Sequence, residues 1–125
     1  MTTHQHSNGA HQREQSADAM RACIEICQSC HATCLATVQH CLQLGGAHAA
    51  PAHIGALLDC AQICATSADF MLRGSDLHAR TCGVCAEACQ RCAESCRALD
   101  NDPQMHACLA ACERCAESCR QMAAM

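Results

Sequence analysis

Several common residues are missing or scarce in this chain of 125 residues, and their absence narrows the range of folds. There is no Trp, Tyr or Lys, and Phe and Val together contribute only three residues. So few aromatic and β-branched residues disfavour β-strands. Leu, Ile, Val and Phe together number 16, which is too few for an ordinary aliphatic core. A formal net charge of −4 is nevertheless too small for disorder to explain that scarcity.

Long apolar runs and clusters of positive charge are also absent. No stretch approaches the 18 apolar residues of a membrane-spanning helix, and the first twenty residues lack the apolar segment of a secretory signal. We therefore expect a cytoplasmic protein, whose thiols stay reduced. Eight basic residues face twelve acidic ones and form no cluster, so neither nucleic acid nor a membrane is expected as a partner.

Turn and capping residues divide the chain into four predicted helices. The Gly pair at 45–46 ends the first helix, and Pro51 suits the first position of the second. Ser75 is predicted to cap the third helix and Asp102 the fourth. Ala, Leu, Gln, Glu and Arg, which favour helix, fill the intervening segments. The helices are expected over residues 17–44, 51–73, 76–99 and 103–123.

The short connections between these helices predict the fold. Loops of about two to six residues place neighbouring helices antiparallel, so residues 16–125 are predicted to form one all-α, antiparallel four-helix bundle. Residues 1–15 are polar and contain His4, His6 and His11. We predict a disordered, flexible N-terminal tail for them, with a weak accessory metal site as the alternative.

Cysteine is the residue that the chain has in unusual quantity, with 16 copies. Successive cysteines within a predicted helix are mostly three or four residues apart in alternation, which is the spacing of the inward-facing seam of a helix bundle. The unit C-x3-C-x2-C-x3-C recurs, most clearly as CAEACQRCAESCR and CLAACERCAESCR. The seam predicts a core lined by Cys23, Cys27, Cys30, Cys34, Cys41, Cys60, Cys64, Cys82, Cys85, Cys89, Cys92, Cys96, Cys108, Cys112, Cys115 and Cys119.

So many inward thiols favour metal binding over simple packing. Leu or Ile at these positions would stabilise the fold by about 1.5–3 kcal/mol per side chain, so a sequence that forgoes this stabilisation uses the sulfur. Thiolates select Cu(I), Zn(II) or iron–sulfur clusters. Zinc in four-cysteine sites leaves excess negative charge in a buried core, whereas bridging thiolates and Cu(I) in a one-to-one ratio are neutral. The sequence therefore predicts several Cu(I) ions per chain, about one for each cysteine.

Other interpretations of the cysteines stay open at this stage. Zinc or another soft metal is the first alternative. Iron–sulfur binding is disfavoured because the C-x2-C-x2-C-x3-C-P run is absent. A thiol redox protein is the alternative from another class, and its best candidates are Cys82 and Cys85 with His78 upstream. No catalytic residues are predicted, so we do not expect an enzyme.

Additional soft donors are predicted at both ends of the bundle, in phase with the cysteines. Thioether and imidazole groups bind Cu(I) without losing a proton, so they suit accessory ligands or a loading mouth. Closing the core as gap-fillers is the competing role of the methionines. The predicted accessory residues are Met20, Met71, His78 and Met122 at one end and His53 and Met105 at the other.

Taken together, these cysteine-bearing helices resemble the copper storage proteins, specifically their cytosolic branch. The resemblance covers about residues 17–123 and depends on the repeated C-x3-C-x2-C-x3-C helices. It implies high-capacity Cu(I) storage by the core thiolates and assembly into a homotetramer. A copper chaperone or an acceptor enzyme is a further candidate partner, which the residues themselves do not identify. The second helix departs from the pattern, because it has only Cys60 and Cys64.

Overall fold

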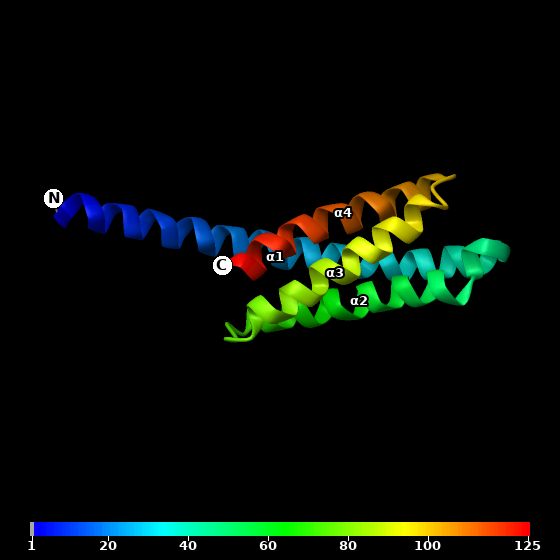
Figure 1. The fold of residues 1–125 in the computed structure, drawn as a ribbon, viewed down its shortest axis with the longest axis horizontal. Coiled ribbons are helices and arrows are strands. Elements are labelled where there is room, and N and C mark those ends of the chain that lie inside the picture. The colour runs from blue at the N-terminus through cyan, green and yellow to red at the C-terminus, as the bar shows by residue number, and fades with distance from the viewer. Residues whose placement is uncertain (1) are drawn as a thin grey trace.

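A computed structural model describes the backbone of residues 2–125 and the side chains of residues 9–10 and 13–125. Over that backbone range it contains four α-helices, one short 3₁₀-helix and no β-strand, which confirms the all-α prediction. The elements in chain order are α1 (Thr2–Leu44), η1 (Gly46–Ala49), α2 (Pro51–Leu72), α3 (His78–Arg97) and α4 (Pro103–Ala124) (Figure 1).

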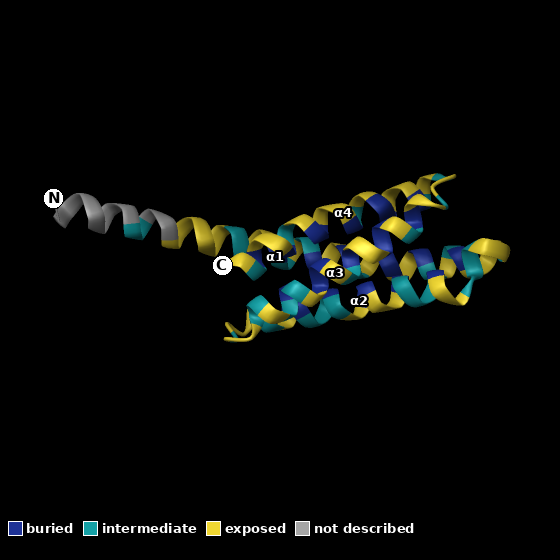
Figure 2. Cartoon of the chain, viewed as in Figure 1, coloured by how far each residue is buried: buried dark blue, intermediate teal, exposed yellow. Residues whose placement is uncertain are grey.

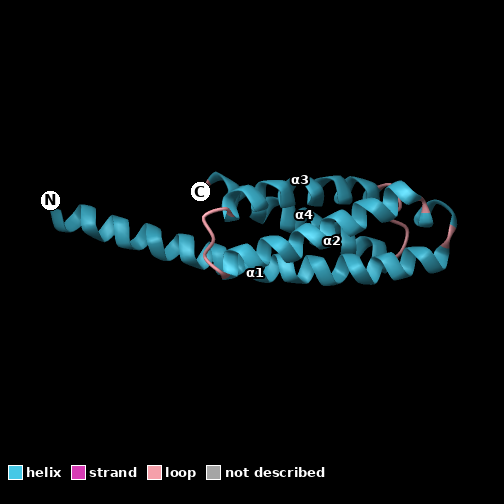
Figure 3. Cartoon of the chain, turned by 90° about the horizontal axis from the view of Figure 1, so that it is seen from below, coloured by secondary structure: helices cyan, strands magenta, loops and turns pink. Residues whose placement is uncertain are grey.

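The four α-helices form an antiparallel bundle, as predicted. Each helix packs against two others, in the cyclic order α1, α2, α3, α4. The connections α1–α2 and α3–α4 lie together at what we call the two-loop end (Figures 1 and 3). The α2–α3 connection and the C-terminus lie at the opposite end, which we call the one-loop end. Side chains from all four helices therefore meet along one shared axis.

Helix α1 begins earlier than the sequence predicts. Its first residue is Thr2, whereas the prediction places the start at residue 17. Residues 10–19 are mostly Ala, Gln, Glu and Arg, so their intrinsic propensity continues the helix without partners. This part of α1 projects beyond the other three helices (Figure 1). His4, His6 and His11 lie outside the residues whose side chains are described, so the accessory metal site of residues 1–15 stays a prediction.

Most predicted helix ends agree with the structure, and one cap was wrong. The Asp102 side chain accepts a hydrogen bond from the Met105 N–H at 2.9 Å and so caps α4. Gly45 and Gly74 have positive φ values of 72° and 66°, which glycine adopts with least strain. Ser75 does not cap α3, because its Oγ accepts from the Leu77 N–H within a tight turn. Helix α3 spans 78–97 rather than the predicted 76–99.

The interior of the bundle consists mainly of sulfur and methyl groups. Buried residues face inward on every helix (Figure 2), and all sixteen cysteines are at most 1% exposed. Leu57 and Leu109 are the buried leucines of the described side chains, and several alanines and methionines complete the core. None of the helices in the described part of the chain has the length and apolar character needed to cross a membrane.

Candidate metal centre

The cysteine sulfurs of different helices are in direct contact in the core. The Sγ atoms of Cys27 on α1 and Cys119 on α4 are 3.5 Å apart, as are those of Cys60 on α2 and Cys89 on α3. Sulfurs four residues apart on α1 are 4.0 Å apart. A disulfide requires an S–S bond of about 2.05 Å, and all sixteen cysteines are free thiols. The predicted common interior for the sixteen cysteines is therefore present.

Among the compact groups that these sulfurs form are five of four cysteines each, joined through shared members. Within each group every Sγ lies within 4.8 Å of the others. Each group shares two cysteines with the next one, so the five groups use only twelve different cysteines. In order along the bundle the groups are Cys27/Cys85/Cys115/Cys119, Cys64/Cys85/Cys89/Cys115, Cys30/Cys60/Cys64/Cys89, Cys30/Cys34/Cys60/Cys112 and Cys34/Cys92/Cys108/Cys112.

The spacing within these groups fits metal ligation. Two thiolates bound to one metal at about 2.3 Å each lie at most about 4.6 Å apart. The observed contacts between cysteines in different helices, 3.5–3.9 Å, fall inside that limit. Because neighbouring groups have two sulfurs in common, a metal in one group and a metal in the next can be bridged by the same thiolates. We call this series of groups the thiolate ladder.

Among the described side chains, none places a buried positive charge beside the ladder. Besides apolar residues, the buried side chains among those described are Thr37, His53 and Ser67. All the arginines of the described part of the chain lie outside the buried set. An unpaired thiolate in such a core is very costly. Contacts with Cys115 and other cysteine sulfurs, together with burial, raise the pKa of Cys64, whereas contacts with Cys112 and other cysteine sulfurs lower the pKa of Cys60. Because none of the described arginines is buried beside these sulfurs, we expect the ladder to hold neutral thiols until a cation replaces their protons.

The candidate redox pair is poorly placed for thiol chemistry. Cys82 and Cys85 are fully buried, and Cys82 lies one turn inside α3. Contact with Cys119 lowers the pKa of Cys82, but contact with Cys23 and burial raise it, and the net result is a pKa of about 12. A redox cysteine needs an accessible thiol with a depressed pKa. Contacts with Cys115 and other cysteine sulfurs lower the pKa of Cys85, but both thiols are fully buried, so neither has the accessibility that a redox cysteine needs.

The two-loop end contains a cluster of a different composition. Cys41 Sγ lies 3.3 Å from His53 Nε2 and 3.6 Å from Met105 Sδ. The other ring nitrogen of His53, Nδ1, lies 2.7 Å from Ser95 Oγ. Cys41, Met105 and His53 are all buried, with His53 4% exposed. Burial raises the pKa of the Cys41 thiol and lowers the pKa of the His53 imidazole, so both groups are neutral.

The structure also places the predicted accessory residues of the one-loop end. Met71 and Met122 belong to the buried core, and Met20 packs against it. His78 is half-buried, and its Nδ1 lies 2.8 Å from the Ser75 carbonyl oxygen. That contact leaves its Nε2 without a partner among the described residues. Two of the four residues, Met71 and Met122, therefore lie in the core, and the other two, Met20 and His78, lie at its margin.

Sequence reasoning did not identify two polar neighbours of the core, Ser95 and Thr37, whereas Ser67 was expected to continue the phase of Cys60 and Cys64. Ser95 contacts His53, but it lies one residue before Cys96 and has no distinguishing spacing. Thr37 is fully buried and its Oγ1 donates to the Thr33 carbonyl at 2.7 Å. Cys34 and Cys41 are seven residues apart, so the inward-facing position between them falls at Thr37. That spacing could have predicted that Thr37 is buried. Ser67, also in phase, is fully buried, and its Oγ has no partner in the described part of the chain.

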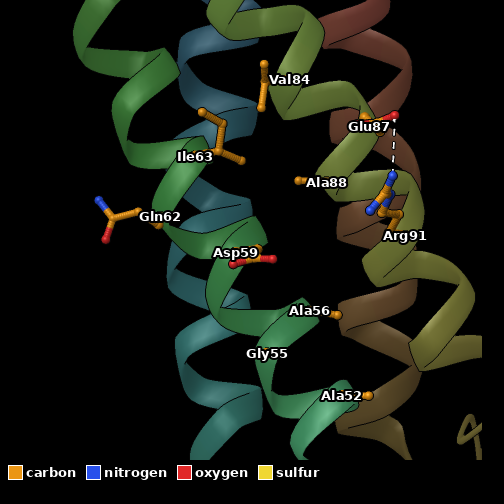
Figure 4. Close-up of a pocket in the computed structure, with 10 residues that line it drawn as sticks. All are labelled: Ala52, Gly55, Ala56, Asp59, Gln62, Ile63, Val84, Glu87, Ala88 and Arg91. Atoms are coloured by element: carbon orange, nitrogen blue, oxygen red, sulfur yellow. Dashed lines mark ion pairs between the residues drawn. The ribbon is translucent and has the colours of Figure 1, made fainter.

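A surface groove lies between α2 and α3, outside the core. Its floor is formed by small residues of α2, including Ala52, Gly55 and Ala56 (Figure 4). On the α3 side it is bordered by Val84, which is 57% exposed, and by the Glu87–Arg91 ion pair of 3.6 Å. No cysteine lines this groove. It is therefore separate from the thiolate ladder.

Fold and core together define the class of protein: a helical bundle whose interior is a continuous set of thiols spaced as metal ligands are. A protein-family model described as "Copper storage protein" matches residues 13–124. That match covers most of the chain, so the chain belongs to the copper storage protein family. No curated protein sequence matches the chain.

Solved structures with the same fold include two copper storage proteins. The Nmul_A1745 protein from Nitrosospira multiformis is 46% identical, with a TM-score of 0.82, over 86% of this chain and 97% of that one. The Cu(I)-bound copper storage protein BsCsp3 is 34% identical, with a TM-score of 0.76, over 84% and 98% of the two chains. Ccsp from Streptomyces lividans, loaded with 10 copper equivalents, is 26% identical, with a TM-score of 0.73, over 86% and 85%.

Proposed function

We propose that this protein binds many Cu(I) ions in its core and so stores or sequesters copper. The observation that carries the proposal is the thiolate ladder, in which each four-cysteine group shares two sulfurs with the next. Shared sulfurs are what a polynuclear metal–thiolate cluster needs, because each thiolate bridges two ions. All sixteen cysteines are proposed as ligands, and the Cu(I)-bound and copper-loaded relatives support copper as the metal.

The charge of the core favours Cu(I) in a one-to-one ratio with thiolate. Each Cu(I) that replaces a thiol proton leaves the net charge of the core unchanged. No buried arginine of the described residues is available to balance extra thiolates. Any stoichiometry with more thiolates than Cu(I) therefore buries uncompensated negative charge, which is strongly unfavourable. Complete loading is expected at about sixteen Cu(I) per chain, one for each cysteine.

Zinc is the second candidate, because three of the four-cysteine groups have no member in common. Each offers four sulfurs within 4.8 Å, as tetrahedral Zn(II) requires. Three such sites would carry a formal charge of −2 each, however, without a buried cation to balance it. The three groups are Cys27/Cys85/Cys115/Cys119, Cys30/Cys60/Cys64/Cys89 and Cys34/Cys92/Cys108/Cys112.

An anaerobic titration distinguishes a cluster with shared thiolates from discrete four-cysteine sites. Reduced protein is titrated with Cu(I) in the presence of a strong chromophoric chelator, and the equivalents withheld from the chelator are counted. Storage through shared thiolates predicts saturation near sixteen equivalents. Saturation near three equivalents would instead show discrete four-cysteine sites and contradict the proposal. A parallel titration with Zn(II) is expected to end near three equivalents.

The proposal extends to the cellular setting of the protein. We place it in the cytoplasm, where reduced thiols persist, and assign it no catalytic activity. A copper chaperone or an acceptor enzyme would deliver or receive the metal. At the one-loop end, Met20, Met71, His78 and Met122 are proposed as accessory soft donors, on the ground that two of them lie in the core itself.

Assembly into a homotetramer is also part of the proposal. The groove between α2 and α3, with its small side chains and exposed Val84, is a surface that a second copy can cover (Figure 4). Replacing Gly55 by Arg would block close approach of a second copy while leaving the core intact. Sedimentation analysis of wild-type and Gly55→Arg protein tests this, with a reduced mass expected for the variant. An unchanged tetramer would exclude this groove as an interface.

A further inference from the structure

We propose that Cys41, His53 and Met105 form a separate site for a single Cu(I) at the two-loop end, with Ser95 holding the histidine in position. The inference rests on the proposed copper binding but concerns a different kind of site. Its ligands are one thiolate, one imidazole and one thioether, rather than bridging thiolates. Each of the four helices supplies one of the four residues.

The contacts of Cys41 set it apart from the ladder. Its Sγ makes its hydrogen-bond-range contacts with His53 Nε2 and Met105 Sδ. The five groups of the ladder, by contrast, contain cysteine alone and do not include Cys41. Cys92 and Cys108 act electrostatically on Cys41, but neither makes a sulfur–sulfur contact with it of the kind that joins the ladder. The donors in contact with Cys41 are the nitrogen and the thioether, and these complete the ligand set of the proposed site.

The two ligand–ligand distances from Cys41 are close to those of a three-coordinate site. With metal–sulfur bonds of about 2.3 Å and a metal–nitrogen bond of about 2.05 Å, trigonal geometry separates sulfur from nitrogen by about 3.8 Å and sulfur from sulfur by about 4.0 Å. The corresponding distances here are 3.3 Å and 3.6 Å. Each needs to open by only about half an ångström, which side-chain rotation alone supplies.

Ser95 orients the His53 ring toward Cys41. Nδ1 lies 2.7 Å from Ser95 Oγ, and the metal-binding tautomer is the one in which Nδ1–H donates to that oxygen and the Nε2 lone pair is directed at Cys41. Metal-binding histidines are commonly oriented by such a hydrogen bond on their second nitrogen. Ser95 is therefore a positioning residue, while Cys41, His53 and Met105 are the ligands.

The charge of the site is balanced without help from the ladder. One Cu(I) replaces the single proton of the Cys41 thiol, and the imidazole and thioether ligands are neutral. The complex therefore has no net charge, which suits its burial. Cu(I) is the probe of choice because sulfur-rich ligand sets with one imidazole suit a soft monovalent ion.

The test follows His53 directly by NMR of ¹⁵N-labelled, reduced full-length protein during anaerobic addition of Cu(I). The Nε2 resonance of His53, assigned by its loss in His53→Gln, is expected to shift on metal binding. His53→Gln and Met105→Leu should each give up about one Cu(I) to a chelator that wild-type protein resists. Val38→Ala, a half-buried change on α1 that removes no donor, is the matched control and should retain the full number.

The separate site and the storage function can fail independently, and the measurements distinguish the two failures. If His53 Nε2 does not shift while uptake reaches about sixteen, the cluster is only a packed hydrogen-bonded contact and the separate site does not exist. If His53→Gln and Met105→Leu retain every equivalent, the same conclusion holds. If total uptake is near three but His53 still shifts, the ladder proposal fails and the separate site stands.

Discussion

Replacing one shared cysteine tests whether the ladder works as a bridged cluster. Cys60 belongs to two of the four-cysteine groups, and its Sγ lies 3.5–3.9 Å from those of Cys30, Cys89 and Cys112. A Cys60→Ser change removes this thiolate and keeps a side chain of similar shape. Its effect on copper capacity differs sharply between a bridged cluster and discrete sites.

The magnitude follows from the geometry. In a bridged cluster with one Cu(I) per thiolate, loss of Cys60 removes about one of sixteen equivalents, because neighbouring thiolates close around the gap. In the arrangement of three discrete sites, the same change disables one site and strands Cys30, Cys64 and Cys89. The capacity would then fall by about one third. The two results are far apart for a titration that resolves one equivalent.

The assay is the anaerobic chelator titration, with two controls. Far-UV circular dichroism of the metal-free variant should match wild type, because the helices form without copper. Cys41 belongs to none of the five groups, so discrete sites predict that Cys41→Ser keeps the full copper capacity. One Cu(I) for each cysteine predicts instead that this variant loses about one equivalent of copper. A fall of one third in Cys60→Ser, together with no change in Cys41→Ser, would refute the bridged cluster.

Three further predictions concern the core and its turns. Ser67→Cys should raise the copper capacity by about one, because Ser67 is buried in phase with the ladder; an unchanged titration would contradict this. Leu57→Ala should destabilise the metal-free fold by about 2–5 kcal/mol in a urea transition, since Leu57 is fully buried; a smaller loss would show that the core collapses around the gap. Gly74→Ala should cost about 1–2 kcal/mol in the same assay because φ is 66°, and no cost would exclude strain at that turn.

The regular features of this protein are predictable from local sequence. Cysteines spaced by three and four residues specify a common face on each helix, and the structure buries all sixteen on that face. Pro51 and Asp102 mark helix starts through local geometry, so both predictions hold. The resemblance to the copper storage proteins depends on that same spacing and is confirmed by the family match.

Features that depend on contacts between helices were less accessible to sequence reasoning. Which thiols share a group depends on the relative heights of the four helices, which no single helix encodes. Ser95 gained its role only because α3 places it beside His53. Ser75 was predicted to cap α3. Its Oγ instead accepts a hydrogen bond from the Leu77 N–H, in the turn that precedes the helix. The start of α1 escaped prediction because no packing residue marks it.

Counting the protons released by copper binding tests the central claim most directly. The ladder begins as neutral thiols, so a bridged cluster with equal numbers of Cu(I) and thiolate releases one proton per copper. A pH-stat titration in weak buffer, starting from an unprotonated Cu(I) complex, is expected to show that ratio from the first equivalent to about the sixteenth. A ratio of two or more protons per copper, ending well below sixteen equivalents, would mean that thiolates are not shared and would contradict the account.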